Sequence, residues 1–262
     1  MKKALIIGIN YIGTSNELHG CINDAMNMKN FLKTEYGFVD KDIFFMSDVS
    51  EDPKKVPTKK NMIAAIKALV LGVKEGDVAY FSYSGHGSNV LDTSGDERDG
   101  KDETLVPLDL DLIIDDDLRK MLVDPLPKGV KLTCIFDCCH SGTGLDLRYN
   151  YQFVGSTAVQ DYKRYITDID KHYKDSLGDV VLLSGCTDDK TSIDAFIEGK
   201  AQGAMTYAFL STMKKLKSKK KEMTYLNVLK NLRQFMKQNG YDQVPQLSTG
   251  RSVNLQSPFS IL

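Results

Sequence analysis

The chain has 262 residues, a length that fits one α/β domain or two smaller ones. Its 34 basic side chains nearly balance its 35 acidic ones, and the net charge of −1 excludes a nucleic-acid binder that relies on a strongly basic surface. With 42% hydrophobic and 26% charged residues, the composition also excludes disordered, collagen-like and membrane proteins.

The first residues contain a short apolar run, Ala4 to Ile9, with no small-residue cleavage site behind it. This pattern favours a buried strand over a secretory leader. No apolar stretch reaches the ~20 residues that a membrane-spanning helix needs. The five cysteines are therefore expected to be reduced thiols in a cytoplasmic protein, where one of them can serve as a catalytic nucleophile.

Short runs rich in Val, Ile and Phe alternate with segments of helical periodicity, a pattern typical of an α/β fold with a mostly parallel sheet covered on both faces. In chain order we expect a strand at 3–9, a helix at 22–35, a strand at 42–47, a helix at 58–73, a strand at 77–83, a helix at 115–123, strands at 130–137 and 179–184, helices at 203–217 and 223–238, and a last strand near 244–248. Thr58 is the expected N-cap of the second helix, and Gly37 and Gly240 are expected to end the first and last helices.

Two segments do not follow this alternation. Residues 88–112 are rich in Asp, Gly and Thr and are expected to form a long loop or a small hairpin. Residues 143–178 combine tyrosines and mixed charges with little periodicity. Loops of such length are usually functional or mobile.

Reactive side chains follow two of the expected strands. His86 lies in YSGHG (83–87), directly after the third strand, and two cysteines lie in DCCHSG (137–142), directly after the fourth. Because active sites of open α/β sheets lie beyond the carboxyl ends of the strands, neighbouring parallel strands would bring His86 and a cysteine together. A cysteine protease needs this pair: the thiolate attacks a carbonyl group, and the imidazole lowers the thiol pKa and later protonates the leaving amine.

The glycines of the first motif suit this chemistry. Gly85 and Gly87 allow the chain to turn tightly around His86, and the amide of Gly87, together with that of the nucleophilic cysteine, can donate to the developing oxyanion. Adjacent side chains point to opposite faces of a strand, so at most one of Cys138 and Cys139 is expected to point towards His86.

Together with four further motifs, these two make the sequence resemble the metacaspases of the caspase-like clan. The motifs are LHGCINDA (18–25), YSGHG (83–87), DGKDETLVPLD (99–109), DCCHSG (137–142), SGCTDDKTSIDA (184–195) and GAMTYAFL (203–210). They stand in the family's order and extend over nearly the whole chain. The separation of His86 and Cys139 is also close to the ~50 residues typical of caspases.

The resemblance implies a single caspase-like αβα sandwich around a mostly parallel sheet, in the short-linker type I arrangement and without a leader domain. Its expected parts are a large catalytic region of about 1–146, a mobile linker at 147–178 and a small C-terminal region at 179–262. In the family motif the reactive thiol directly precedes His-Ser-Gly, which selects Cys139 as the nucleophile. Cys138 is then a packing thiol, and His140 a positioned turn residue.

Metacaspases cleave after Arg or Lys, and the resemblance places the pocket for this side chain at Cys21, Asp24, Ser84 and Asp137. Two carboxylates beside small polar groups suit a basic side chain, because a buried cation needs a carboxylate partner. Asp24 taken alone has an alternative role as an acidic residue favoured in the first turn of a helix. The expected partners are proteins or peptides with Arg or Lys before the cut.

The resemblance also implies a calcium ion, Ca2+, that activates the enzyme without taking part in the bond chemistry. Its implied ligands are Asp99, Asp115, Asp116 and Asp146. Hard cations need several oxygen ligands, and spacing alone leaves Asp96, Asp102 and Asp117 as substitutes. Residues 115–117 are equally typical of the first turn of a helix. Because Asp146 follows Cys139 closely, an ion there is expected to order the loop that shapes the active site.

Self-cleavage is expected in the basic linker, after Lys163 or Arg164, and the family implies a monomer. Three alternatives stay open. A noncatalytic, calcium-responsive interaction module would share the fold, although intact His86 and Cys139 favour a peptidase. A zinc site at the adjacent cysteines would lack the usual C-x(2 to 4)-C spacing, and a nucleotide site after the first strand would lack the GxGxxG and P-loop patterns.

Overall fold

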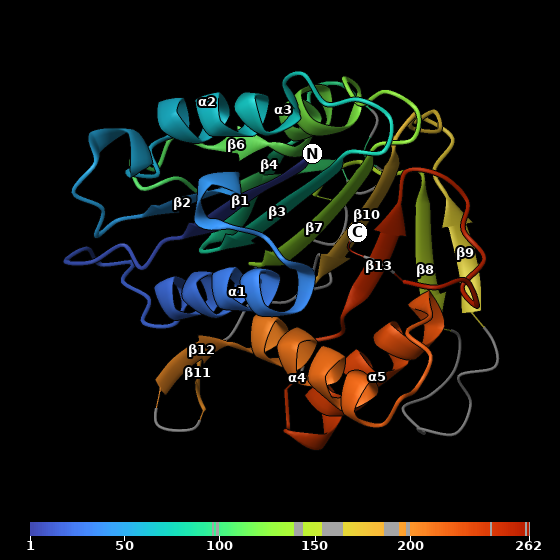
Figure 1. Cartoon of the computed structure of the whole chain (residues 1–262). Coiled ribbons are helices and arrows are strands. Elements are labelled where there is room, and N and C mark those ends of the chain that lie inside the picture. The colour runs from blue at the N-terminus through green and yellow to red at the C-terminus, as the bar shows by residue number, and fades with distance from the viewer. Residues whose placement is uncertain are drawn as a thin grey trace.

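The structure is a computed structural model, shown in Figure 1. It describes residues 1–95, 97, 100–138, 144–153, 165–185, 194–197, 200–241, 243–259 and 261. Within these residues no helix is both long and apolar enough to span a lipid bilayer.

An eight-stranded sheet forms the middle layer, with the strand order β2-β1-β3-β7-β10-β13-β8-β9 (Figure 1). The strands are β1 (Lys2–Gly8), β2 (Ile43–Ser47), β3 (Val78–Ser84), β7 (Lys131–Asp137), β8 (Tyr149–Phe153), β9 (Tyr165–Ile169), β10 (Asp179–Ser184) and β13 (Gln246–Thr249). The strands from β2 to β10 in this order pair in parallel, whereas β13, β8 and β9 join with antiparallel pairing. The expected mostly parallel sheet is therefore confirmed.

Helices cover both faces of this sheet, as the expected αβα sandwich requires. One face carries α1 (Cys21–Tyr36), α4 (Ala204–Ser218) and α5 (Tyr225–Gln238), and the other carries α2 (Lys59–Val70) and α3 (Asp115–Leu118) (Figure 1). The helix expected at 115–123 is α3 followed by a π-helical turn, Arg119–Val123. Short 3-10 turns lie at Asp40–Asp42 and Pro53–Lys55.

Two hydrophobic cores, one on each face, follow from the alternation of side chains along the strands. In β1, Leu5 and Ile7 belong to the core beneath α2, whereas Ala4 and Ile6 belong to the core beneath α1 and α4. In β3, Tyr83 points to the first core and Tyr80 to the second. Burial on both faces explains why these strands are almost continuously apolar in the sequence.

Residues 88–112, expected to form a long loop or a small hairpin, belong to a small antiparallel sheet. The strands β4 (Gly87–Leu91) and β5 (Lys101–Leu105) form a hairpin, and β6 (Ile113–Ile114) pairs with β5. A second hairpin, β11 (Asp194–Ile197) and β12 (Lys200–Gly203), leads into α4. Since β4 follows β3 after only two residues, its start is fixed beside the carboxyl end of β3.

The second irregular segment differs from the expected linker, because it contributes the strands β8 and β9 to the central sheet. The pairing of β8 to β13 is antiparallel and joins residues about a hundred positions apart, such as Tyr151 and Leu247, and β9 then pairs antiparallel with β8. Such long-range pairing leaves no local signature in the sequence, which is why the segment resembled a linker. Residues 154–164, between the two strands, lie outside the described part of the chain.

The helix ends follow the expected capping residues. Thr58 is the N-cap of α2, and its hydroxyl oxygen accepts a hydrogen bond from the Asn61 amide (3.4 Å). Gly37 ends α1 with a left-handed backbone (φ 66°), a conformation that glycine adopts without strain. At the end of α5, Asn239 is the C-cap, and Gly240 follows with φ 74°.

The N-cap gives a first testable prediction. Thr58→Ala is expected to lower the free energy of unfolding by about 1 kcal/mol, because the Asn61 amide loses its acceptor. Urea unfolding followed by circular dichroism measures the change. Thr58→Ser keeps the hydroxyl and is expected to retain most of the wild-type stability; an equal loss in both variants would contradict the capping role.

Candidate active site

The carboxyl ends of β3 and β7 lie next to each other at one edge of the sheet. The parallel register pairs Ser84 with Asp137, and the Gly85 amide donates a hydrogen bond to the Asp137 carbonyl oxygen (3.4 Å). In the chain, His86 stands two residues beyond Ser84, and Cys139 stands two residues beyond Asp137. Residues 139–143 themselves lie outside the described residues. The register thus brings the two motifs to neighbouring strand ends.

The His86 imidazole is half-buried and has a defined orientation. Its Nε2 lies 2.8 Å from the carbonyl oxygen of Asn16. Because a carbonyl oxygen can only accept a hydrogen bond, Nε2 must carry the proton, which leaves the lone pair of a neutral ring on Nδ1. The ring also packs on Tyr11, with the two centroids 4.7 Å apart. His86 is therefore arranged to accept a proton at Nδ1.

The backbone amide of Gly87 points away from its neighbouring strand. The Val106 amide donates to the His86 carbonyl oxygen (3.1 Å), and Gly87 is opposite Leu105 in the antiparallel ladder. Hydrogen-bonded and non-hydrogen-bonded pairs alternate in such a ladder, so the Gly87–Leu105 pair is of the non-hydrogen-bonded kind. The Gly87 amide is consequently not used by β5, which suits the expected role in an oxyanion hole.

Cys138, His19 and His172 differ from His86 in their surroundings. Cys138 is buried in the core beneath α2, as expected of a packing thiol. Within the described residues, Cys21, Cys134 and Cys138 take part in no disulfide bond. The side chains of His19 and His172 are 72% and 54% exposed, beside Glu17 and Asp170 respectively. His140 lies outside the described residues.

Three of the four expected pocket residues form one buried polar cluster, and Cys21 begins the helix that supplies Asp24. The Ser84 hydroxyl donates to Asp24 Oδ2 (2.9 Å), and so does the Gly203 amide (2.8 Å). Asp137 Oδ2 accepts from the Thr206 amide (2.7 Å). Asp24, Ser84 and Asp137 are each at most 3% exposed. Two carboxyl groups are therefore held close together beneath the edge of the sheet.

The start of α4 fixes the two carboxylates. Gly203 is its N-cap, and Thr206 lies in its first turn, so the positive end of the helix dipole faces both charges. A Cβ atom on Gly203 would lie 2.6 Å from Asp24 Oδ2 and in still closer overlap with Asp137 Oδ2. Only glycine leaves room for both carboxylates here. All the hydrogen-bond donors just named are neutral, so they stabilise the negative charge without neutralising it.

A second acidic cluster joins residues that are far apart in the chain. Carboxylate oxygens of Glu97, Asp115 and Asp146 lie within 4.8 Å of one another. Asp115 is 1% exposed and Asp146 2%, and within the described residues neither carboxylate oxygen of Asp146 makes a hydrogen bond. Burial raises the pKa of both groups, and the nearby charges of Asp115 and Glu97 raise the pKa of Asp146 further. A buried set of mutually repelling oxygens fits a hard divalent cation.

This cluster contains two of the four expected calcium ligands. Asp115 and Asp146 belong to it, whereas the Asp116 carboxylate accepts from Lys120 Nζ (2.9 Å) outside the group. Asp99 and its possible substitute Asp96 lie outside the described residues. Glu97 was not expected, because the many acidic residues of 96–117 give no local signal that distinguishes it.

Arg119 anchors the loop that carries Asp146. Its guanidinium donates to the Asp146 carbonyl oxygen and to the Lys174 carbonyl oxygen (3.1 Å), and it lies over the Tyr173 ring at 4.7 Å. Asp146 itself has a left-handed backbone with φ 48°. The ligand loop is therefore tied to the segment that precedes β10.

The sequence matches known proteins over its whole length. Residues 2–148 match the family described as the metacaspase, peptidase C14 domain. The chain belongs to the metacaspase family. It is 39% identical to the metacaspase-1 of Kluyveromyces lactis over 299 aligned residues, which cover 98% of this chain and 68% of that protein. It is also 39% identical to the metacaspase-1 of Mycosarcoma maydis, over 99% of this chain and 73% of that protein.

Solved structures show the same fold. A protein from Geobacter sulfurreducens aligns over 100% of this metacaspase and 99% of its own chain, with a TM-score of 0.68 and 26% identity. The caspase-1 of Spodoptera frugiperda aligns over 94% of this chain and 85% of its own, with a TM-score of 0.50 and 13% identity. Family and fold together make this metacaspase a caspase-like cysteine peptidase that acts on proteins.

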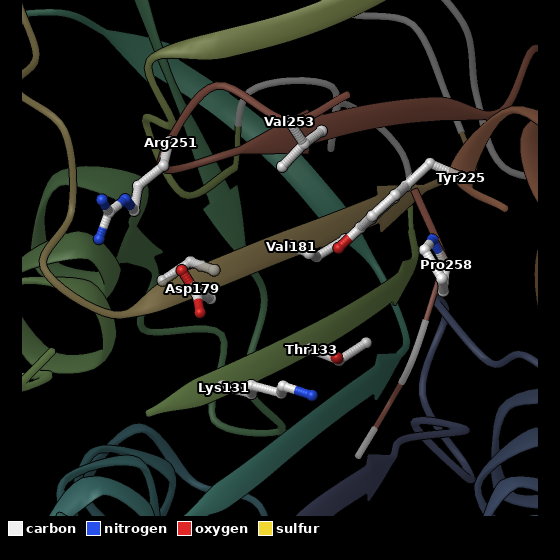
Figure 2. A pocket seen from close by; sticks show the side chains of 9 residues that line it. Lys131, Thr133, Asp179, Val181, Tyr225, Arg251, Val253 and Pro258 are labelled. Atoms are coloured by element: carbon white, nitrogen blue, oxygen red, sulfur yellow. The ribbon is translucent and has the colours of Figure 1, made fainter. Parts of the chain in front are cut away.

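A separate cavity of about 140 Å3 lies at the other end of the metacaspase sheet. Figure 2 shows Lys131 and Thr133 on β7, Asp179 and Val181 on β10, and Arg251 beyond β13 around it. The residues are at the amino ends of β7 and β10, whereas His86 and Asp137 are at the carboxyl ends of β3 and β7. This cavity is therefore not part of the peptidase site.

Proposed function

We propose that this metacaspase is a calcium-activated endopeptidase that cleaves proteins after Arg or Lys through a Cys139–His86 dyad. The observation that carries the proposal is the arrangement of His86, which follows β3 at the strand end next to that of β7 and keeps Nδ1 for proton transfer. The pocket and the calcium site rest on the two acidic clusters described above.

The dyad supplies both proton transfers of the reaction. The Cys139 thiolate attacks the scissile carbonyl carbon, and the oxyanion that forms accepts hydrogen bonds from the Gly87 and Cys139 amides. Protonated His86 then gives its Nδ1 proton to the leaving amine as the C–N bond breaks. Water then attacks the resulting thioester, and His86 Nδ1 takes a proton from this water. The C–S bond breaks, the carboxyl product is released, and Cys139 is again a thiolate.

Asp24 and Asp137 select the side chain before the scissile bond. Their two negative charges receive hydrogen bonds from the Ser84 hydroxyl and two neutral amides, and a guanidinium or ammonium group would neutralise them. Burial strengthens this attraction, because the screening by water is weak there. An aspartate side chain would be repelled, so the preference is opposite to that of a peptidase that cleaves after Asp.

Glu97, Asp115 and Asp146 would hold the calcium ion, and Asp99 and Asp116 stay proposed ligands beside them. The fit rests on the Asp146 carboxylate, whose two oxygens are buried without a hydrogen bond within the described residues. When bound, the cation supplies charge neutralisation and orders the loop before Asp146, which begins at the DCCHSG motif. The ion activates by ordering this loop and takes no part in bond cleavage.

Calcium is therefore expected to raise the melting temperature of the wild-type protein, and Asp146→Asn is expected to abolish this increase. The asparagine keeps the size of the side chain and removes one of the charges that attract the ion. Differential scanning fluorimetry with calcium and with excess chelator measures the shift. Asp170→Asn, which alters a half-buried carboxylate beside His172, serves as the control and should respond to calcium like the wild type.

Self-cleavage, assembly and location complete the proposal. Cleavage after Lys163 or Arg164 would fall outside the described residues, between β8 and β9, where both flanking strands hold the new ends. A monomer is supported by β13, which pairs with β10 on one side and β8 on the other and so presents no edge. A nucleophilic thiol needs a reducing compartment, which supports the cytoplasm.

Peptide cleavage tests the proposal. Fluorogenic peptides with Arg, Lys or Asp before the scissile bond are offered to the wild type and Cys139→Ala, with and without calcium, and self-cleavage products are mapped by mass spectrometry. We expect turnover of the Arg and Lys peptides and fragment formation only by the wild type with calcium. Equal results with Cys139→Ala would contradict the dyad and would favour an interaction module with the same fold.

A further inference from the structure

We infer that Tyr11 and Tyr83 are positioning residues that hold His86 in its reactive geometry through a pair of phenol hydroxyl groups. The inference rests on the proposed function of His86 and names two residues to which the sequence analysis gave no role. Both side chains are fully buried, Tyr11 directly after β1 and Tyr83 on β3.

The two phenols contact both polar groups of the His86 main chain. The His86 amide donates to the Tyr11 hydroxyl oxygen (2.9 Å), and the Tyr83 hydroxyl donates to the His86 carbonyl oxygen (2.7 Å). The Tyr11 hydroxyl in turn donates to the Val106 carbonyl oxygen (2.5 Å), and the two hydroxyl oxygens are 3.2 Å apart. His86 is thereby connected to Val106, the residue after β5, through the two phenols. The hydrogen bond between the Val106 amide and the His86 carbonyl oxygen connects them directly.

This arrangement replaces part of a regular ladder. The Val106 amide donates to the His86 carbonyl oxygen (3.1 Å), which is one half of an antiparallel hydrogen-bonded pair. In a regular pair the His86 amide would donate to the Val106 carbonyl oxygen. Here Tyr11 stands between these two groups and serves as acceptor to one and donor to the other. The inserted phenol widens the ladder at the point where the chain carries the imidazole.

The surrounding backbone is adapted to the two hydroxyl groups. A Cβ atom on Gly85 would lie 2.7 Å from the Tyr83 hydroxyl oxygen and 3.0 Å from that of Tyr11. The glycine before His86 is thus required by the phenols as well as by the turn. Tyr11 has φ 52°, a left-handed conformation that is unusual for a residue with a large side chain. Structural strain of this kind persists where the surroundings enforce it, and it is common next to active sites.

The phenols act as fixed donors and acceptors. Burial raises the pKa of Tyr11 and of Tyr83 far above neutrality, so both keep their protons over the working range of the enzyme. The Tyr11 ring also packs on the imidazole, with centroids 4.7 Å apart and planes inclined by 43°. Together with the Asn16 carbonyl at Nε2, these contacts fix the position, the ring plane and the tautomer of His86.

Removal of the hydroxyl groups tests the inference. Tyr11→Phe leaves two backbone groups without their partner, so kcat for an Arg peptide is expected to fall on the order of tenfold or more, since small displacements of catalytic groups have large effects on rate. KM is expected to stay within about twofold, because the hydrogen bonds of the phenols described above lead to His86 and Val106 and not to the pocket carboxylates. Tyr83→Phe is expected to have a smaller effect, because the Val106 amide still holds the His86 carbonyl oxygen.

Tyr80→Phe is the matched control. Tyr80 is also fully buried on β3, but it lies on the opposite face, where its hydroxyl donates to Met28 Sδ (2.9 Å). This variant loses a buried phenol hydroxyl of the same strand and is expected to keep its kcat within about twofold. An equal fall in kcat for Tyr80→Phe and Tyr11→Phe would mean that the loss of any buried phenol hydroxyl lowers activity through the fold. That result would overturn the inference.

A second readout does not require peptidase activity. In the Cys139→Ala background, imidazole 15N NMR at pH 8 reports the tautomer of His86, which is assigned by the loss of its signals in His86→Ala. We expect a single Nε2–H tautomer of His86 in Cys139→Ala and in Cys139→Ala with Tyr80→Phe. In Cys139→Ala with Tyr11→Phe we expect a mixture of tautomers or exchange broadening. An unchanged His86 spectrum in Tyr11→Phe would contradict the positioning role, whereas a failure of the proposed function would appear only in the cleavage assay.

Discussion

Replacement of His86 by alanine is expected to lower kcat for an Arg peptide by about 10²- to 10⁴-fold, the range that a positioned general acid and base contributes. His86 accepts and returns the proton at Nδ1, while its Nε2 donates to the Asn16 carbonyl oxygen (2.8 Å). Without the imidazole the Cys139 thiol also loses the neighbour that favours its thiolate form. KM should change little, because the pocket residues remain.

The His86 measurement is a steady-state assay of purified variants with calcium. His172→Ala is the control, since His172 is exposed beside Asp170 and has no part in the site, and it should retain wild-type kcat. Retention of more than about a tenth of the wild-type kcat by His86→Ala would remove His86 from the catalytic dyad. A circular dichroism spectrum of each variant verifies that the fold is intact.

Asp24→Asn is expected to lower kcat/KM for an Arg peptide by about 30-fold or more, which corresponds to the ~2 kcal/mol lower limit for the loss of one partner of a buried charge pair. Asparagine has the same shape, and its carbonyl oxygen can still accept from the Ser84 hydroxyl and the Gly203 amide. The variant therefore removes a negative charge with little change in the hydrogen bonds around it.

The rate at which iodoacetamide alkylates Cys139 distinguishes this effect from a structural one. Alkylation uses the nucleophile and His86 but not the pocket, so Asp24→Asn should alkylate at the wild-type rate. If alkylation and peptide cleavage slow to the same extent, Asp24 supports the site as a helix residue only, which was the alternative role of an acidic residue in the first turn of α1.

The sequence predicts the fold best where a local pattern is strong. The strands of the parallel core and the helix ends at Thr58 and Gly37 follow from apolar runs and capping residues, and the structure has them close to the expected positions. In contrast, β8 is fixed by antiparallel pairing to β13, far away in the chain, and β9 by pairing to β8, and neither composition nor periodicity marks these two strands.

The site was predictable in the same uneven way. His86, Ser84 and Asp137 follow strand ends, and Asp24 lies in a motif of the family, so their meeting could be foreseen. Tyr11 could not, because its hydroxyl contacts Val106 and His86, 95 and 75 residues away. A tyrosine shortly after a buried strand resembles an ordinary core residue. Glu97 and Arg119 were missed for the same reason: their partners, such as Asp146, are brought near only by the folded chain.

Covalent labelling with a peptidyl chloromethyl ketone that ends in arginine tests the central claim most directly, because the reagent requires the nucleophile, the base and the acidic pocket at once. After incubation with calcium, peptide mapping by mass spectrometry locates the adduct. The account predicts one adduct, on Cys139, that forms much more slowly in His86→Ala and with the corresponding aspartyl reagent. An adduct on Cys138 or Cys21, or equal rates with the arginyl and aspartyl reagents, would contradict it.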